Sequence, residues 1–154
     1  MSFEEANMEN FKAIYRVVGV IAFISVVIWA VSSTNNTKIL NIESNVKKEY
    51  SSIQQLPDAT FLSVESSHKS NKALVDAKFK TDKNYDEIKK YYDDELKKLG
   101  WIFESEKSVK VWGKDLGGKI IRYTKGEYSL NVEYAGSMAD YVWTYAIDVG
   151  WGYN

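Results

Sequence analysis

A run of fifteen residues without a single charge, 17–31, constrains this chain of 154 residues more than any other feature. Residues 14–15 and 32–34 are also uncharged, and Arg16 is the only charged residue between 14 and 34. The stretch therefore reaches about 20 residues, the length that crosses the hydrocarbon core of a bilayer. A surface helix of a soluble domain would carry charges on its exposed face. We therefore expect residues 14–34 to form a transmembrane helix.

A cleaved signal peptide is the alternative interpretation of the same run. Lys12 and Arg16 could form its basic start, and the small residues at 30–32 resemble a cleavage site. An uncleaved signal anchor is favoured because the head of 16 residues is long and carries three glutamates. A lipid anchor on cysteine is excluded, since the chain has no cysteine.

The cations that flank the run predict its orientation. Lys12 and Arg16 lie close to its N-terminal side, whereas the first cation beyond Val31 is Lys38, seven residues further on. We expect a single-pass protein of the cell membrane, with a short cytoplasmic tail over residues 1–13 and an exported domain over residues 58–154.

Composition narrows the class of partner. The chain has 20 Lys and Arg and 21 Asp and Glu; removing the two cations and three carboxylates of residues 1–31 leaves 18 of each. A nucleic-acid partner is not expected, because binding to a phosphate backbone needs a cationic surface. The absence of cysteine fits a bacterial envelope protein better than a eukaryotic secreted domain, which often carries disulfides.

Residues 35–57 predict an amphipathic linker helix. Apolar residues recur there with helical spacing, and the only proline, Pro57, is expected to end the helix. This apolar face consists of Ile39, Ile42, Val46, Ile53 and Leu56. Two interpretations stay open: self-association of the chain through residues 39–56, or packing of the helix on its own domain.

The clearest element is a helix over residues 84–99. Asn84 and Glu87 form a capping-box pattern, and Gly100 supplies a left-handed C-cap. We expect Trp101, which follows directly, to return the chain to the sheet as a core anchor. The apolar stripe of this helix consists of Tyr85, Ile88, Tyr92, Leu96 and Leu99.

Short alternating segments surround this helix and predict strands. Two precede it, over 60–66 and 73–80, joined by a polar hairpin loop. The segments that follow it are 101–105, 109–112, 119–124, 127–134 and 141–151, with residues 113–119 expected as a plain strand connection. The predicted fold class is α+β: after the transmembrane and linker helices, an antiparallel sheet of five to six strands in the order strand-strand-helix-strands, with one helix packed on one face.

No catalytic, cofactor or metal site is predicted. His68 is the only histidine and lies in the polar hairpin loop, without a neighbouring serine or acidic cluster. The acidic run at 93–95 lies on a helix, where successive side chains point about 100° apart and cannot converge on one ion. An enzyme that uses Asp76, Asp82 and Asp148 is the weaker alternative, because it requires two of these carboxylates to meet in a cleft with a raised pKa.

The aromatic residues near residue 150 are the candidate partner-binding residues. Apolar side chains occupy every odd position from 141 to 153, so that a strand presents them on one face. Either the helix over 84–99 covers this stripe and it is core, or its end stays exposed and binds a partner, where Trp and Tyr are common anchors. The candidates are Trp143, Tyr145, Trp151 and Tyr153.

The segment 75–101 resembles a pattern found in small bacterial envelope proteins and lipoproteins of unassigned function. In those proteins an extended segment that ends in a Thr-Asp pair leads into a helix. The helix ends with Tyr-Tyr, several further residues, Leu and then Gly-Trp, and a meander of strands follows. The matching residues in this chain are Thr81-Asp82, Tyr91-Tyr92 and Leu99-Gly100-Trp101. The resemblance covers most of residues 58–154 and implies the fold alone. This chain differs from the lipoproteins in having a predicted membrane helix in place of a lipid-bearing cysteine.

These features predict a non-enzymatic, single-pass envelope protein whose exported domain binds a protein or an envelope component. An alternative is a membrane-anchored immunity protein that neutralises a toxin acting in the periplasm. The two would differ in genetic context, since an immunity gene lies beside its toxin gene.

Overall fold

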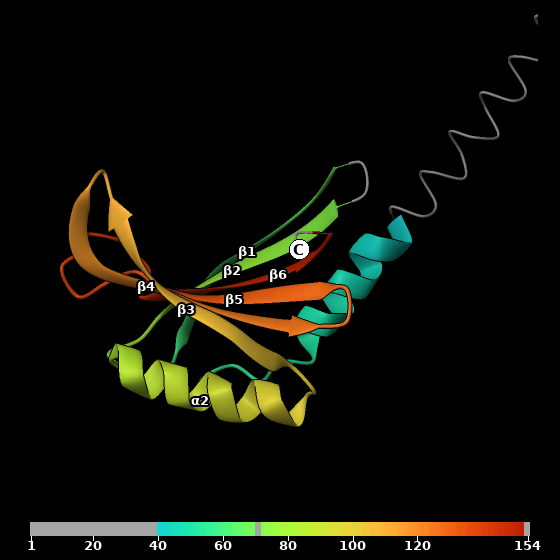
Figure 1. Cartoon of the computed structure of the whole chain (residues 1–154), viewed down its shortest axis with the longest axis horizontal. Helices are drawn as coiled ribbons and strands as arrows, with labels where there is room; N and C mark the ends of the chain where they lie inside the picture. The colour runs from blue at the N-terminus through green and yellow to red at the C-terminus, as the bar shows by residue number, and fades with distance from the viewer. Residues whose placement is uncertain (1–39, 70–71, 153–154) are drawn as a thin grey trace, which may run out of the picture. The chain divides into compact units, whose positions relative to one another are not determined.

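A computed structural model describes residues 40–69 and 72–152 (Figure 1). The predicted tail over 1–13, the predicted transmembrane helix over 14–34 and the candidate residue Tyr153 lie outside the described residues. Within the described residues, no helix combines the length and the apolar character needed to cross a bilayer.

The described chain is α+β, as predicted, and contains a six-stranded antiparallel sheet with two helices on one face (Figure 1). The strand order is β1-β2-β6-β5-β4-β3, so that β1 and β3 are the edges. The strands are β1 (Thr60–Lys69), β2 (Lys72–Lys80), β3 (Ile102–Val111), β4 (Lys114–Lys125), β5 (Tyr128–Tyr134) and β6 (Tyr145–Trp151). Helix α2 (Tyr85–Lys98) joins β2 to the far edge strand β3.

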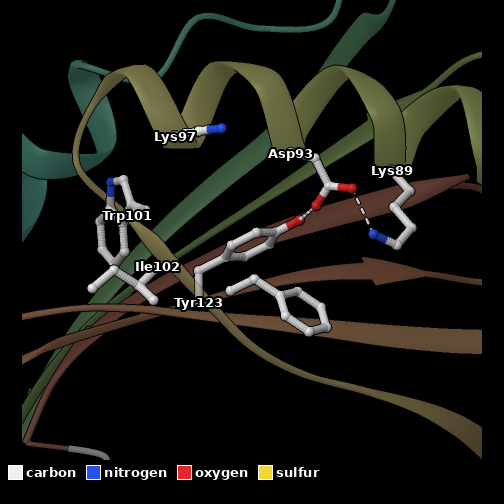
Figure 2. A pocket seen from close by; sticks show the side chains of 7 residues that line it. Lys89, Asp93, Lys97, Trp101, Ile102 and Tyr123 are labelled. Carbon is white, nitrogen blue, oxygen red and sulfur yellow. Dashed lines mark hydrogen bonds and ion pairs between the residues drawn. The ribbon is translucent and has the colours of Figure 1, made fainter.

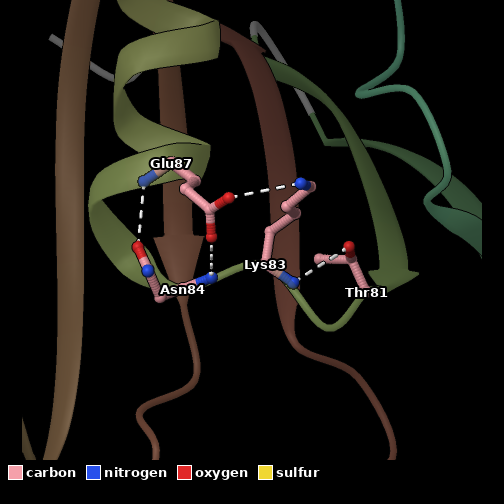
Figure 3. A network of polar contacts seen from close by, with 4 residues as sticks. All are labelled: Thr81, Lys83, Asn84 and Glu87. Atoms are coloured by element: carbon pink, nitrogen blue, oxygen red, sulfur yellow. Dashed lines mark hydrogen bonds and ion pairs between the residues drawn. The ribbon is translucent and has the colours of Figure 1, made fainter.

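Both ends of α2 form as the sequence predicts. The Asn84 side chain accepts a hydrogen bond from the Glu87 amide at 3.1 Å, and the Glu87 carboxylate accepts one from the Asn84 amide at 3.0 Å (Figure 3). At the other end Gly100 has a φ of 82°, and the Trp101 amide donates to the Leu96 carbonyl at 2.9 Å. This Schellman geometry turns the chain directly into β3.

The core lies between α2 and the sheet. Ile88, Tyr92 and Leu96 of the helix are fully buried, as are alternate residues of β2, β5 and β6. Tyr92 lies against Tyr145 of β6, with 3.1 Å between the two hydroxyl oxygens, and Tyr145 stacks on Phe79 of β2 at a centroid distance of 5.0 Å. The predicted apolar stripes of the helix and of the last strand therefore face each other.

The linker helix, residues 40–51 of the described chain, ends earlier than predicted. Residues 52–59 leave the helix well before Pro57, and Ile53 and Leu56 enter the core from this irregular segment. The hydroxyls of Ser51 and Ser52 hydrogen-bond to helix carbonyls at 2.7 Å, which favours a helix end there.

The linker helix packs on its own domain, on the same side of the sheet as α2 (Figure 1). Val46 is fully buried, Glu49 pairs with Lys125 of β4 at 2.8 Å, and Glu43 contacts His68 of β1 at 2.7 Å. Two helices therefore cover the sheet, where one was predicted. The apolar face that self-association through 39–56 would use contributes Val46 to the domain's own core.

The structure corrects three predictions about where the strands of the C-terminal half begin and end. The segments 101–105 and 109–112 belong to the single edge strand β3, which stays continuous through two bulges although its residues do not alternate cleanly. The connection predicted at 113–119 is mostly strand, because Trp112 and Gly113 alone make the turn, with φ values of 51° and 79°. Strand β6 begins at Tyr145 rather than at 141.

The burial of Val46 leads to a prediction about stability. Val46→Ala in the full-length chain is expected to lower the free energy of unfolding by about 2 kcal/mol, because two buried methyl groups are lost and a cavity remains. Urea denaturation in detergent micelles, followed by tryptophan fluorescence, measures the change. Leu40→Ala, in the exposed part of the same helix, is the control and stays within about 0.5 kcal/mol of the parent. Equal stability of Val46→Ala and the parent would contradict an integral linker helix.

Candidate functional site

The three candidate aromatic residues that the structure describes do not form one surface. Tyr145 is fully buried between Tyr92 and Phe79, so it belongs to the core and offers no surface to a partner. Trp143 precedes β6 and Trp151 ends it, which places them at opposite ends of the strand. Tyr153 lies outside the described residues.

Trp143 and Trp151 are each half-buried against neighbouring residues. Trp143 stacks on Tyr141, with 5.3 Å between the ring centroids. The Trp151 indole nitrogen donates a hydrogen bond to Glu127 at 3.3 Å, and its ring packs against the edge of the core. Either residue could form part of a contact surface, but the two do not share one.

Two of the three carboxylates that an enzyme would need face each other. Asp76 of β2 and Asp148 of β6 are paired in register on the sheet face opposite the helices, which we call the open face. Burial and, after it, the nearby carboxylates of Glu133 and Asp76 together raise the pKa of Asp148 to about 8, while Lys78 opposes this shift. Asp82, by contrast, is exposed in the turn before α2.

The open face also explains why Asp148 holds a proton at neutral pH. Its register neighbour on β5 is Asn131, which is followed on β4 by Arg122. The Lys78 ammonium group pairs with Asp76 at 3.3 Å, so it stabilises the charged form of Asp148 less than an unpaired lysine would. A carboxyl group half-buried among other carboxylates is more stable in the neutral form.

No group of histidine, cysteine and carboxylate side chains in the described part of the chain has the arrangement of a metal site. The only histidine, His68, contacts Glu43 of the linker helix instead. The structure thus gives His68 a place in the packing of that helix against β1.

An apolar hollow lies beside α2, where the chain leaves the helix and enters the edge strand β3 (Figure 2). We call it the α2–β3 groove. Its volume is about 510 Å³. The lining residues come from α2, from the residue before β3 and the first two residues of β3, and from β4: Lys89, Asp93, Lys97, Trp101, Ile102, Phe103 and Tyr123.

Polar contacts fix one wall of the α2–β3 groove. The Tyr123 hydroxyl donates to Asp93 Oδ1 at 2.6 Å, and Lys89 pairs with the other carboxylate oxygen (Figure 2). Burial and the hydrogen bond to Asp93 both raise the pKa of Tyr123, so that the hydroxyl remains a donor. Phe103 packs edge-on against the Tyr123 ring with 6.0 Å between centroids. These contacts preform the wall before any ligand arrives.

The mouth of the groove exposes two large apolar side chains and a lysine. Ile102 is 69% exposed and Phe103 is 50% exposed. Lys97 lies on the rim and is exposed, and among the described residues it has no ion-pair partner. The groove therefore offers an apolar surface beside an uncompensated positive charge.

Sequence reasoning missed this groove, although one signal was present. Trp101, Ile102 and Phe103 are three consecutive large apolar residues at the start of a strand, where one buried face accounts for only alternate positions. Trp101 was correctly predicted as a core anchor and is buried. The other two point to the surface because β3 is an edge strand.

A second exposed apolar group lies around the β3–β4 turn. Trp112 at the tip is 98% exposed, and Met138 and Val142 in the loop before β6 are also exposed. The Met138 amide donates to the Leu116 carbonyl at 3.3 Å, which holds this loop beside β4. The residues of the α2–β3 groove, by comparison, line a hollow of about 510 Å³, so we place the candidate site there.

The pKa of Asp148 leads to a prediction about pH. Because the pKa lies near 8 in the folded state and near 3.8 in an ordinary aspartate, the folded protein holds a proton that the unfolded chain releases. The free energy of unfolding should therefore fall as pH rises from about 4 to about 8. Asp148→Asn removes this dependence and raises stability at pH 8 by about 1 kcal/mol or more.

Urea denaturation at several pH values tests this prediction. The control is Asp94→Asn, on the exposed side of α2, which should keep the slope of the parent. If Asp148→Asn and the parent lose stability in parallel between pH 4 and 8, the proton is not held at Asp148.

Comparison with known proteins finds no matching family model, no matching curated protein and no matching solved structure. The candidate site therefore rests on its own geometry: a preformed apolar groove at a sheet edge, with an unpaired lysine at its rim.

Proposed function

We propose that this chain is a non-enzymatic, single-pass membrane protein whose exported domain binds a polypeptide partner in the α2–β3 groove. The observation that carries the proposal is the exposure of Ile102 and Phe103 at the mouth of this groove. Full burial of a side chain of this size against a partner contributes about 1.5 to 3 kcal/mol, which is enough to make it an anchor.

The charges at the groove indicate the kind of segment that it fits. Lys89 is already paired with Asp93, whereas Lys97 is left to pair with a ligand. A partner segment with an apolar anchor residue close to an Asp or Glu would fill the groove and neutralise Lys97. A basic segment would instead bring like charges together and be disfavoured.

The preformed wall favours a binding role over a purely structural one. Tyr123, Asp93 and Lys89 are held by mutual contacts, so a ligand would not need to order them on binding. The Asp76–Asp148 pair lies on the opposite face of the sheet and takes no part in this groove. A chemical step is therefore not part of the proposal.

Photocrosslinking in native membranes tests the proposal. A benzophenone side chain placed at position 102 of the full-length chain should crosslink one polypeptide, which mass spectrometry then identifies. The same group at position 64, on the other edge strand β1 where Val64 is 48% exposed, is the matched control and should not capture that polypeptide. Capture of the same polypeptide from both positions, or of none from position 102, would overturn the proposal.

A matched pair of variants measures the contribution of the groove. Phe103→Ser should weaken binding of the captured partner about tenfold or more, because an anchor contact is lost, while Val64→Ser leaves it unchanged. The melting temperatures of both variants should stay close to that of the parent, since both side chains are half exposed. Equal binding by Phe103→Ser and the parent would exclude Phe103 as an anchor.

The identity of the captured polypeptide separates the two predicted roles. A toxin encoded beside this gene would establish the immunity role, and loss of this chain would then be lethal only when the toxin is made. A resident envelope protein would establish an accessory subunit.

A further inference from the structure

A second hollow lies on the open face, away from the α2–β3 groove. Its volume is about 420 Å³, and it extends over parts of β3, β4 and β5. Its lining combines apolar surface with three basic side chains, those of Lys107, Lys110 and Arg122. Its lining includes Ser105, Lys107, Lys110, Ile120, Arg122 and Asn131.

Positive charge dominates this hollow. Lys107 and Lys110 are exposed, and no described carboxylate pairs with either of them. Arg122 lies 3.1 Å from Glu104, so one of the three cations is compensated at least in part. The two remaining ammonium groups create a positive potential that a bound anion would neutralise.

A buried acceptor lies at the other side of the hollow. Asn131 Oδ1 is shielded from solvent and accepts no hydrogen bond from a described residue. A buried acceptor without a donor costs free energy, so a ligand hydroxyl placed there would offset that cost. Ser105 stands two strands away in the same register row, next to Arg122.

The residues paired in register across the six strands change in charge from one edge of the open face to the other. Across the sheet this row runs Glu65, Asp76, Asp148, Asn131, Arg122 and Ser105, from acidic on β1, β2 and β6 to basic on β4. A bound anion is attracted toward the lysines of β3 and repelled from the acidic strands. The uncharged, hydroxyl-bearing part of such a ligand would then face Asn131.

We propose that this hollow binds a small anion that also carries hydroxyl groups, such as the phosphate of a polyol or the carboxylate of an acidic sugar. The lysines recognise the charge, and Asn131 recognises a hydroxyl. This site is independent of the polypeptide groove, because the lining residues of the two hollows do not overlap. Such a unit could come from a soluble envelope polymer or from a lipid headgroup, since both carry polyol phosphates.

Isothermal titration of the full-length protein in detergent micelles tests the proposal with defined probes. Glycerol 3-phosphate should bind, whereas glycerol, which lacks the charge, should not. Inorganic phosphate, which lacks the carbon-bound hydroxyls, should bind more weakly. The absence of heat for glycerol 3-phosphate at millimolar concentration, or equal affinity for phosphate and glycerol 3-phosphate, would overturn the assignment.

Variants locate the site. Lys107→Gln combined with Lys110→Gln should lower the affinity for glycerol 3-phosphate about tenfold or more, because charge-assisted hydrogen bonds are lost. Lys90→Gln, an exposed lysine on α2, is the matched control and should leave the affinity unchanged. Asn131→Ala should remove the preference for glycerol 3-phosphate over phosphate while keeping phosphate binding. Equal weakening by Lys90→Gln would show binding to surface charge in general and contradict the proposed site.

A final pair of probes distinguishes the sources. Soluble poly(glycerol phosphate) and vesicles containing phosphatidylglycerol present the same chemical unit, one free and one at a surface. Binding of the polymer assigns the site to an envelope polymer, and binding of the vesicles alone assigns it to lipid. Both assignments require the loss seen with the double lysine variant; binding that the double variant retains would contradict the site.

Discussion

The packing of α2 along the strands is the contact on which the arrangement of the domain depends. Three contacts follow β4 in order: Lys119 with Tyr85 at the start of the helix, Tyr123 with Asp93 in its second half, and Lys125 with Trp101 just after its end. A helix of 14 residues is about 21 Å long, close to the roughly 20 Å that seven strand residues span. The capping box at Asn84 and the Schellman turn at Gly100 fix both ends of this helix. They also bring the chain out beside the edge of the sheet, which is where the α2–β3 groove forms.

Helix α2 was predictable because its signals lie within a few residues of each other. The strand ends and the end of the linker helix were less predictable because they depend on contacts between residues far apart in the chain. Asn84, Glu87 and Gly100 determine their own conformations through neighbours a few residues away, so the helix was predicted almost residue by residue. The strands were placed approximately, because alternation marks a buried face but not the end of an edge strand. The linker helix was predicted too long since helical spacing continued through Ile53 and Leu56, which in fact reach the core from an irregular segment.

The candidate sites were less predictable, for a related reason. Ile102 and Phe103 are exposed only because β3 is an edge, and strand order is not readable from a single sequence. The row that joins Asp76, Asp148 and Asn131 depends on the pairing register of strands that are far apart in the chain. Sequence reasoning named Asp76 and Asp148 as candidate carboxylates, and the register shows that they are neighbours. It also placed Tyr145 on an aromatic stripe, but the choice between core and surface required the position of Tyr92.

The central place of β6 has a consequence for how the domain is made. β6 is the last described strand in chain order, yet it lies between β2 and β5 and supplies the only link between β1–β2 and β5–β4–β3 within the described sheet. Until it arrives, β2 and β5 each have an open edge that can pair with other chains. Synthesis from the N-terminus would therefore leave two unfinished ribbons until the residues of β6 emerge. The time between emergence of β2 and of β6 is the period in which this chain is most exposed to misassembly and most in need of a holding chaperone.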